Sequence, residues 1–414
     1  MDNATIHIKA PNHAIKGSIT LNGSKSIANR ALIIQALCKD DFVIQNLSNA
    51  DDTLVLQQLL NSNDTILDAG AGGTTFRFLT AFLALQEGRT VVLTGSERMQ
   101  QRPIKILVDA LNSLGADISY TNNTGFPPLR ITGKKLSGGK IILPADISSQ
   151  YISAILMIAP LLENGLTMQL EGEIVSIPYI EMTLRLMNYF GITTNFEGNT
   201  INVEQGNYIA KDFFVEGDWS AASYFYAITS LAEAAEITLH GLTNQQIQGD
   251  SIIARIGEQF NIKTTYNIDN SITIVKGIEN NVDYFEYDFI RCPDLAQTVM
   301  AMCAGNCIDA TFKGLQTLKI KETDRVAAMN TELFDLGFAT IEQQDTNEWT
   351  LENCTPQVYN QHEINTYEDH RMAMALAPLA LKIGTLTIKE SGVVSKSYPN
   401  FWNDLNILGF EYNS

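Results

Sequence analysis

The stretch SSQYISAILMIAPLL, residues 148–162, starts with two serines and is then apolar on nearly every side of a helix. Serine at a helix start can accept a hydrogen bond from a free backbone N–H group. A helix that is apolar on all faces is normally buried, and this one is too short to cross a membrane. The stretch therefore predicts a helix at the centre of a folded domain.

Five other segments share this plan of a small polar or acidic start and an apolar, alanine-rich run. They are SKSIANRALIIQALC (24–38), GTTFRFLTAFLAL (73–85), DWSAASYFYAITSLAEA (218–234), PDLAQTVMAMCA (293–304) and EDHRMAMALAPLAL (368–381). Most begin roughly seventy residues apart, and recurrence at such a period indicates a repeated structural unit.

A second set of six helices alternates with the first and is amphipathic. Apolar residues from Ile106 to Leu114 recur at the spacing of one helix face. Glycines stand where left-handed caps would end four of these helices: Gly115, Gly191, Gly337 and Gly409. The segments that carry the amphipathic helices begin at Ile44, Leu93, Leu170, Leu239, Phe312 and Ile388.

Short alternating strands separate the helices, as in TVVLTG (90–95) and EITLHG (236–241). The pattern predicts an α/β fold of six repeats. Six repeats exceed the size of one hydrophobic core, so we expect two domains of three repeats each. The crossover between them is expected near residues 210–220.

Composition excludes several classes of protein. The 414 residues are 45% hydrophobic and 18% charged, which rules out a disordered chain. With 46 acidic against 28 basic residues the net charge is −18, which disfavours nucleic acid and anionic membranes as partners. There is no apolar run long enough for a membrane span and no signal peptide pattern.

The five cysteines form no CxxC pair, and the histidines form no HExxH motif. We interpret the cysteines as reduced cytosolic thiols rather than as a disulfide framework or a zinc site. No metal site is indicated.

Cations and hydroxyls gather at the expected helix starts. The helix dipole repels a cation at this end, which destabilises the helix. A bound anion would offset this repulsion, so cations at helix starts indicate an anion-binding site. A ligand with several negative groups would explain the pattern, although any one of these residues alone could be a surface ion pair or a cap. The residues include Lys25, Ser26, Arg30, Gly73, Arg77, Arg102, Ser148, Ser149, Gln150, Lys321, Arg325, His370, Arg371 and Lys396.

Two acids lie among these cations. Asp294 starts a buried helix, and Glu322 lies between Lys321 and Arg325. Either acid could exchange a proton with a bound anion, or Asp294 could be an N-cap and Glu322 a first-turn acid. Lys25 could neutralise developing charge or donate a proton.

Ten segments together resemble the 5-enolpyruvylshikimate-3-phosphate synthase family, in family order from residue 21 to about 402. They are LNGSKSIANRALIIQAL, GGTTFRFL, TGSERMQQRPI, SSQYISAILMIAPL, SIPYIEMTL, VEGDWSAASYF, PDLAQTVMA, KIKETDRVAAM, YEDHRMAMALA and SKSYPNFW.

The resemblance implies a two-domain enolpyruvyltransferase-like fold with three βαβαββ repeats in each domain. Residues 18–215 would form the N-terminal lobe, on the shikimate 3-phosphate side. Residues 1–17 and 216–414 would form the C-terminal lobe, with the active site in the cleft between the lobes. The implied protein is a cytoplasmic monomer without metal or cofactor.

The implied reaction joins two small anions. The 5-hydroxyl of shikimate 3-phosphate attacks C2 of phosphoenolpyruvate while C3 is protonated, and the tetrahedral intermediate loses phosphate to give an enolpyruvyl ether. The product leads to chorismate and the aromatic amino acids.

The resemblance also implies the roles of individual residues. Asp294 would be the base at the 5-hydroxyl, and Glu322 the proton donor to C3, with Lys25 as a competing donor. Shikimate 3-phosphate would be bound by Lys25, Ser26, Arg30, Ser148, Ser149, Gln150, Ser176, Tyr179, Asp294 and Lys321. Phosphoenolpyruvate would be bound by Lys25, Gly73, Arg102, Gln150, Arg325, Arg371 and Lys396.

Three other functions are alternatives. The first is the sister enolpyruvyltransferase that acts on UDP-N-acetylglucosamine, although the GSKSxxNR and KETDR matches favour the shikimate branch. The second is a non-catalytic anion-binding solenoid. The third, an NAD-dependent dehydrogenase, has only the weak glycine pattern around Gly70 and Gly72 in its favour.

Overall fold

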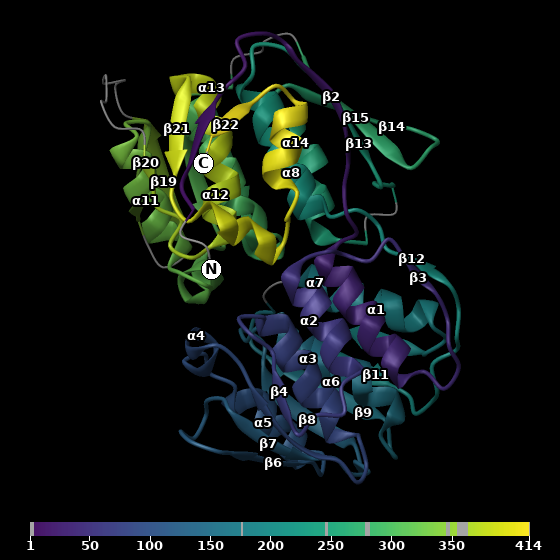
Figure 1. Cartoon of the computed structure of the whole chain (residues 1–414). Helices are drawn as coiled ribbons and strands as arrows, with labels where there is room; N and C mark the ends of the chain where they lie inside the picture. Colours follow the sequence, from purple (N-terminus) through teal and green to yellow (C-terminus); the bar gives the residue numbers. More distant parts are fainter. Residues whose placement is uncertain are drawn as a thin grey trace. The chain divides into compact units, whose positions relative to one another are not determined.

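The computed structural model describes residues 4–174, 177–244, 247–277, 282–344, 348–353 and 363–413. The chain divides into two compact units (Figure 1). Unit 1 comprises Met1–Asn22 and Glu216–Ser414, and unit 2 comprises Gly23–Val215. The chain passes from unit 2 to unit 1 within the interval that the repeat spacing predicts.

Unit 2 is built around three buried helices. These are α1 (Lys25–Leu37), α3 (Gly73–Ala84) and α6 (Ser149–Ile158), each at an expected position. The amphipathic helices are α2 (Asp51–Leu60), α5 (Lys105–Ser113) and α7 (Ile177–Tyr189), and a short helix α4 spans Glu97–Gln100.

Two sheets of unit 2 follow one plan. In each, a first strand pairs in parallel with a second, and a hairpin pairs antiparallel with that second strand. One sheet contains β4 (Ile66–Asp68), β5 (Thr90–Thr94), β7 (Leu129–Thr132) and β6 (Asp117–Tyr120). The other contains β8 (Gly139–Pro144), β9 (Leu166–Glu171), β11 (Thr200–Val203) and β10 (Thr194–Glu197). A smaller sheet pairs β3 (Ile44–Gln45) with β12 (Phe213–Phe214) in parallel.

Unit 1 repeats the arrangement. Its buried helices are α8 (Trp219–Leu231), α10 (Ala296–Gly305) and α12 (His370–Leu376), the last followed by α13 (Ala380–Ile383). The amphipathic helices are α9 (Ile253–Glu258), α11 (Arg325–Asp335) and α14 (Phe401–Ile407).

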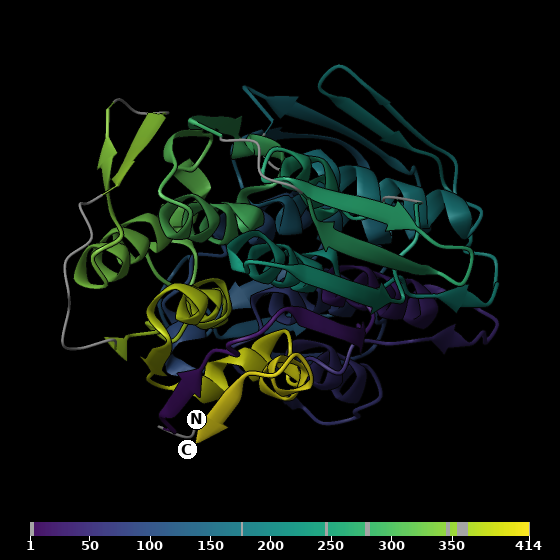
Figure 2. The same ribbon diagram turned by 90° about the horizontal axis from the view of Figure 1, so that it is seen from above.

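Three four-stranded sheets accompany these helices, and Figure 2 views them from above. The first contains β2 (Ile15–Thr20), β13 (Ala235–His240), β15 (Ser271–Lys276) and β14 (Ile262–Tyr266). The second contains β16 (Tyr284–Asp288), β17 (Asp309–Lys313), β19 (Glu348–Asn353) and β18 (Ala339–Gln343). The third contains β20 (Glu363–Ile364), β21 (Thr385–Ile388), β1 (Ile6–Lys9) and β22 (Glu411–Asn413).

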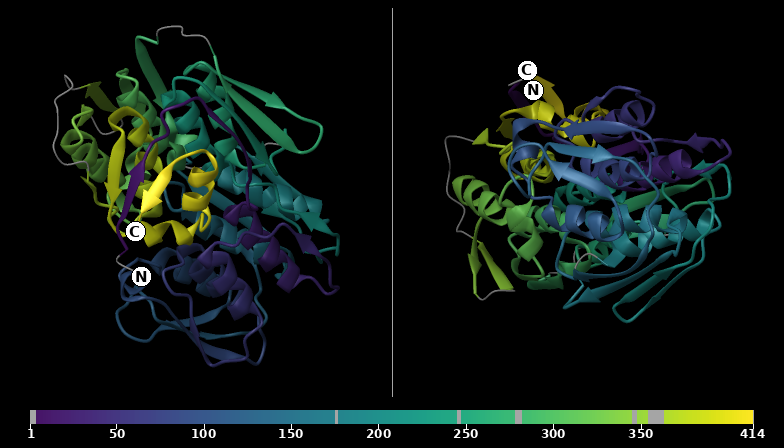
Figure 3. Two further views of the ribbon diagram at one scale, coloured as in Figure 1. Left: turned by 45° about the horizontal axis from the view of Figure 1, so that its top comes forward. Right: turned by 90° about the horizontal axis from the view of Figure 1, so that it is seen from below.

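The start of the chain supplies two strands to unit 1. β1 pairs antiparallel with both β21 and β22, as the left view of Figure 3 shows. β2 pairs in parallel with β13 along its whole length. A lobe boundary at residue 18 is therefore wrong, because Ser18 and Thr20 belong to the β2–β13 ladder and unit 1 continues to Asn22.

Some of the predicted helix caps are confirmed and others are wrong. All four predicted cap glycines have positive φ, a conformation that glycine adopts without steric cost. Ser148 and Asp218 cap α6 and α8 as expected. Ser24 makes no capping hydrogen bond, Asp294 binds an arginine instead, and Asp369 rather than Glu368 caps α12.

Burial of α8 generates a prediction about stability. Ile228 on α8 is fully buried, whereas Ile268 is fully exposed in a loop of the same unit. We expect Ile228→Ala to lower the free energy of unfolding by about 2–5 kcal/mol, because the deletion leaves a cavity in the core. Ile268→Ala, the control, should change it by less than about 0.5 kcal/mol.

Urea unfolding followed by tryptophan fluorescence measures this difference. All three tryptophans, Trp219, Trp349 and Trp402, belong to unit 1, so the signal reports on that unit. Equal losses for the two variants would contradict the burial of α8.

Candidate active site

In unit 2, the predicted site residues meet at the N-terminal ends of its helices. Lys25 is the first residue of α1, and its Nζ lies 3.2 Å from Asp52 Oδ2 on α2. The backbone carbonyl of Asp52 accepts a hydrogen bond from Thr75 Oγ1 on α3, at 2.7 Å. Asp52 therefore joins the starts of α1 and α3.

Two arginines lie against the first residue of α3. A Cβ atom added to Gly73 would lie 2.5 Å from Arg77 Nη1 and 2.6 Å from Arg102 Nη1. A larger residue at this position would therefore displace the ends of both arginine side chains. Two cations beside free N–H groups at a helix start form a local arrangement that attracts an anion.

Gln150 connects α6 to this place. Its Oε1 accepts a hydrogen bond from Arg77 Nη1 at 2.8 Å, and its Nε2 donates to Thr74 Oγ1 at 3.0 Å. Ser148 Oγ accepts from the backbone N–H of Gln150, and Ser149 is buried beside it.

Arg30 is buried between three helices and bonded to protein groups. Its Nε donates to Thr183 Oγ1 at 2.7 Å, and its Nη2 donates to Ser153 Oγ at 2.9 Å. Its other hydrogen bonds to described residues go to backbone carbonyls, Ser26 O at 2.8 Å and Tyr179 O at 3.4 Å. Burial lowers the pKa of Arg30 to about 10. Arg30 thereby links Ser26 and Tyr179, two other predicted site residues, while Ser176 lies outside the described residues.

In unit 1, the predicted site residues surround one buried guanidinium. Arg325, at the first position of α11, is 2% exposed. Its Nη1 lies 2.9 Å from Asp294 Oδ1, its Nη2 lies 2.9 Å from Glu322 Oε2, and its Nε lies 2.7 Å from Asp369 Oδ2. Burial would lower the pKa of Arg325, but these carboxylates hold it above its usual range.

Asp294 is surrounded by cations. Besides Arg325, Arg371 Nη2 lies 3.2 Å from its Oδ2, and Lys321 Nζ lies 3.8 Å from its Oδ1. Both candidate proton-transfer acids, Asp294 and Glu322, are therefore held by one arginine. A substrate anion that reaches Arg325 would compete with these carboxylates for its guanidinium group.

A buried polar network continues from Arg371. Arg371 Nη2 lies 3.5 Å from Ser220 Oγ on α8, and Ser220 donates a hydrogen bond to Asp250. Burial raises the pKa of Asp250 to about 6, the charge of Asp294 adds to this, and Arg371 opposes it. Gln248 completes the network with bonds to Asp218 and Ser220.

The last predicted cation, Lys396, donates a hydrogen bond to the carbonyl of Glu368 at 2.6 Å. Lys396 ends a 3-10 segment, Ser391–Lys396, and Arg102 lies in the loop between α4 and α5. The prediction that these cations gather at helix starts therefore does not hold for Arg102, Lys321 and Lys396.

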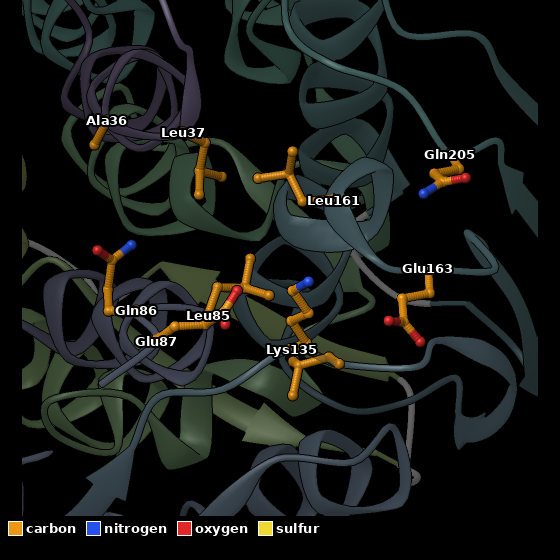
Figure 4. A pocket seen from close by; sticks show the side chains of 10 residues that line it. Ala36, Leu37, Leu85, Gln86, Glu87, Lys135, Leu161, Glu163 and Gln205 are labelled. Carbon is orange, nitrogen blue, oxygen red and sulfur yellow. The ribbon is translucent and has the colours of Figure 1, made fainter. Parts of the chain in front are cut away.

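A separate hollow of about 480 Å³ lies at the other ends of the helices of unit 2 (Figure 4). It includes Leu37 at the end of α1, about 18 Å along the helix from Lys25 at 1.5 Å per residue. None of the predicted site residues lines it. The lining residues are Ala36, Leu37, Leu85, Gln86, Glu87, Lys135, Leu136, Leu161, Glu163 and Gln205.

Across the described ranges, no group of three His, Cys, Asp or Glu side chains is placed to hold a metal ion. Within the same ranges, no helix is both long and apolar enough to span a bilayer.

Sequence reasoning missed several residues of these networks. Asp52, Ser153 and Thr183 contact predicted site residues in unit 2. In unit 1, Asp369 contacts Arg325, and Asp250 binds Ser220 and interacts electrostatically with Asp294 and Arg371. Asp369 stands in the YEDHR segment beside the predicted Arg371, but the sequence alone does not show that its partner is Arg325, 44 residues away.

Comparisons with known proteins agree with the motifs. A family model described as EPSP synthase (3-phosphoshikimate 1-carboxyvinyltransferase) matches residues 9–62 and 55–405. A 3-phosphoshikimate 1-carboxyvinyltransferase of Bacteroides fragilis is 48% identical over 405 residues, covering 97% of each chain. The enzyme of that name from Colwellia psychrerythraea is 36% identical, over 94% of this chain and 96% of its own.

Fold similarity extends further than sequence similarity. The EPSP synthase structure from Acinetobacter baumannii matches with a TM-score of 0.81 at 22% identity, covering 99% of this chain and 100% of that one. This match shows the two-domain α/β fold.

The buried Asp250 generates a prediction about pH. Its pKa in the folded chain, about 6, lies above the value of about 3.9 for an unfolded aspartate. The folded state therefore holds the proton more tightly, and this contribution to stability is full below about pH 4 and is lost as the pH rises to 6. Asp250→Asn cannot titrate, so the stability of the unmodified chain relative to the variant should fall between about pH 4 and pH 6.

Urea unfolding monitored by tryptophan fluorescence at several pH values provides the measurement. Asp335→Asn, a change at an exposed aspartate of the same unit, is the control. Curves for Asp250→Asn that run parallel to those of the unmodified chain would refute this account of Asp250.

Proposed function

The chain belongs to the EPSP synthase family, and on that premise we propose that it transfers the enolpyruvyl group of phosphoenolpyruvate to the 5-hydroxyl of shikimate 3-phosphate, releasing phosphate. The reaction is an addition followed by an elimination through a tetrahedral intermediate. It belongs to the shikimate pathway, which leads through chorismate to the aromatic amino acids.

One observation in unit 1 supports this chemistry above all. Asp294 and Glu322 both lie 2.9 Å from the same guanidinium, that of Arg325. The reaction needs one proton removed from a hydroxyl and one delivered to carbon, and two carboxylates held at one cationic centre suit these two tasks. We assign Asp294 as the base and Glu322 as the donor to C3, with Lys25 as the competing donor.

The cations of unit 1 fit the second substrate. Arg325, Arg371 and Lys396 are assigned to phosphoenolpyruvate, and Lys321, beside Asp294, is assigned to shikimate 3-phosphate. Arg371 and Lys321 already contact the carboxylate of Asp294, so a bound anion would compete with that acid for them. Binding would thereby release Asp294 to act on the hydroxyl.

The groups of unit 2 fit the remaining anionic positions. Lys25, Gly73, Arg102 and Gln150 form the linked arrangement described above and are assigned to phosphoenolpyruvate, with Lys25 and Gln150 also touching shikimate 3-phosphate. Ser26, Ser148, Ser149, Ser176 and Tyr179 are assigned to shikimate 3-phosphate. Arg30 is assigned there as well, and its bonds to Ser26 and Tyr179 give it a positioning role.

The alternatives receive less support. The matching family model and the curated relatives carry the shikimate name rather than that of the UDP-N-acetylglucosamine enzyme. A non-catalytic solenoid gives no reason for two acids on one buried arginine. A cytoplasmic location, a monomeric state and activity without a cofactor belong to the proposal.

Phosphate release tests the function directly. Mixed with both substrates, the chain should liberate inorganic phosphate, and with either substrate alone it should not. Glu322→Gln keeps the shape of the side chain but cannot supply the proton as an acid. We expect it to lower kcat by about 10²–10⁴-fold, the usual contribution of a general acid, while the affinity for shikimate 3-phosphate stays within about twofold.

Glu342→Gln removes the same charge from an exposed position on β18 and is the matched control. No phosphate release by the unmodified chain would overturn the proposed function. Normal turnover by Glu322→Gln would remove only that residue from the mechanism.

We further propose that the substrates engage residues of both units at once. Solution scattering should then give a smaller radius of gyration when shikimate 3-phosphate is added. An unchanged radius with saturating ligand would count against this part of the proposal.

A further inference from the structure

The turn that precedes α12 has an unusual backbone. It follows β20 and covers residues 365–368, and its last two residues, Tyr367 and Glu368, have φ of 54° and 55°. Two consecutive left-handed residues other than glycine are strained, so the surrounding contacts must hold them in place.

This turn carries the groups that orient the cations of unit 1. The carbonyl of Glu368 accepts the hydrogen bond of Lys396. The next residue, Asp369, pairs with Arg325 and also accepts from the backbone N–H of Arg371 at 2.9 Å. The positions of Lys396, Arg325 and Arg371 therefore all depend on the conformation of one turn.

The carboxylate of Glu332 holds the turn by hydrogen bonds. Glu332 Oε2 accepts from the backbone N–H of Asn365 at 3.1 Å, and Glu332 Oε1 accepts from Asn365 Nδ2 at 3.3 Å. Tyr367 OH donates to the same Oε1 at 2.6 Å. Glu332 is only 1% exposed, and in the described part of the chain its carboxylate contacts no lysine or arginine. Within the described residues, its carboxylate oxygens therefore accept hydrogen bonds from donors of the turn.

Glu332 and Arg325 belong to the same helix, α11, seven residues and two turns apart. They lie on the same face of the helix. Glu332 binds Asn365 and Tyr367 within the turn, and Arg325 binds Asp369, the residue that follows the turn. Burial, together with the Glu332 carboxylate, raises the pKa of Tyr367, which keeps its hydroxyl a donor.

We infer that Glu332 is a positioning residue for phosphoenolpyruvate binding: it holds the strained turn 365–368 and thereby sets the positions of Arg325, Arg371 and Lys396. It touches no substrate in this assignment. The inference rests on the proposed function, because the cations matter only as ligands of that anion.

Steady-state kinetics of Glu332→Gln and Tyr367→Phe test the inference. Gln retains the size of Glu but replaces one acceptor oxygen with a donor, and Phe removes one of the three donors. We expect the KM for phosphoenolpyruvate to rise on the order of tenfold in Glu332→Gln and less in Tyr367→Phe. The KM for shikimate 3-phosphate, which rests mainly on unit 2, should stay within about twofold.

Glu342→Gln is the charge-matched control and should leave both constants unchanged. A purely structural role for Glu332 predicts a lower Tm with both KM values unaltered well below that Tm, and this result would overturn the inference. If Glu332→Gln does not fold, Tyr367→Phe decides alone, and an unchanged KM for phosphoenolpyruvate overturns it. An inactive unmodified chain is a different outcome, since it refutes the proposed function itself.

Discussion

The burial of the Arg325 guanidinium is the constraint on which the chemistry of unit 1 depends. A charge removed from water must be matched by partners, and losing one partner of a buried pair is strongly destabilising. The partners come from three separate places: the turn before α10, the segment before α11, and the cap of α12. One side chain therefore fixes the starts of three helices, and the two acids proposed for proton transfer are positioned by the same requirement.

Arg30, the buried arginine of unit 2 described above, has partners of a different kind. Among the described residues, the hydrogen-bond partners of Arg30 are hydroxyl groups and backbone carbonyls, with no carboxylate. Its positive charge is not cancelled locally, and the paired guanidinium groups beside Gly73 add to it. Arg30 of unit 2 thus bonds to hydroxyl and carbonyl groups, whereas Arg325 of unit 1 is balanced by carboxylates, two of which are proposed to exchange protons. The proposed function places anion-binding cations in both units, and the base and the leading proton donor in unit 1.

Much of this fold follows from sequence alone, for clear physical reasons. A run such as residues 148–162 can only be stable as a buried helix, and α6 forms there with nearly every residue out of contact with water. The cations of the site were recognisable because they conflict with the helix dipole at Lys25, Arg325 and Arg371.

The partners of these cations were not recognisable in the same way. Asp52 lies 27 residues from Lys25, and Asp369 lies 44 residues from Arg325. Nothing in the spacing distinguishes such acids from the many on the surface. Asp294 and Glu368 were misjudged as possible helix caps because capping depends on a local backbone geometry, which competes with longer-range ion pairs. The lobe boundary at residue 18 failed because strand β2 has its partner more than 200 residues away.

The placement of β1 between β21 and β22 has a consequence for how the protein is made. Unit 2 is continuous in sequence, so all of its strands and helices exist once Val215 has emerged from the ribosome. β1 (Ile6–Lys9), in contrast, is synthesised long before its partners, because within the described residues its strand partners begin at Thr385 and Glu411. Until residues 385–413 have been synthesised, β1 therefore lacks the two strands between which it lies, and this sheet of unit 1 cannot form.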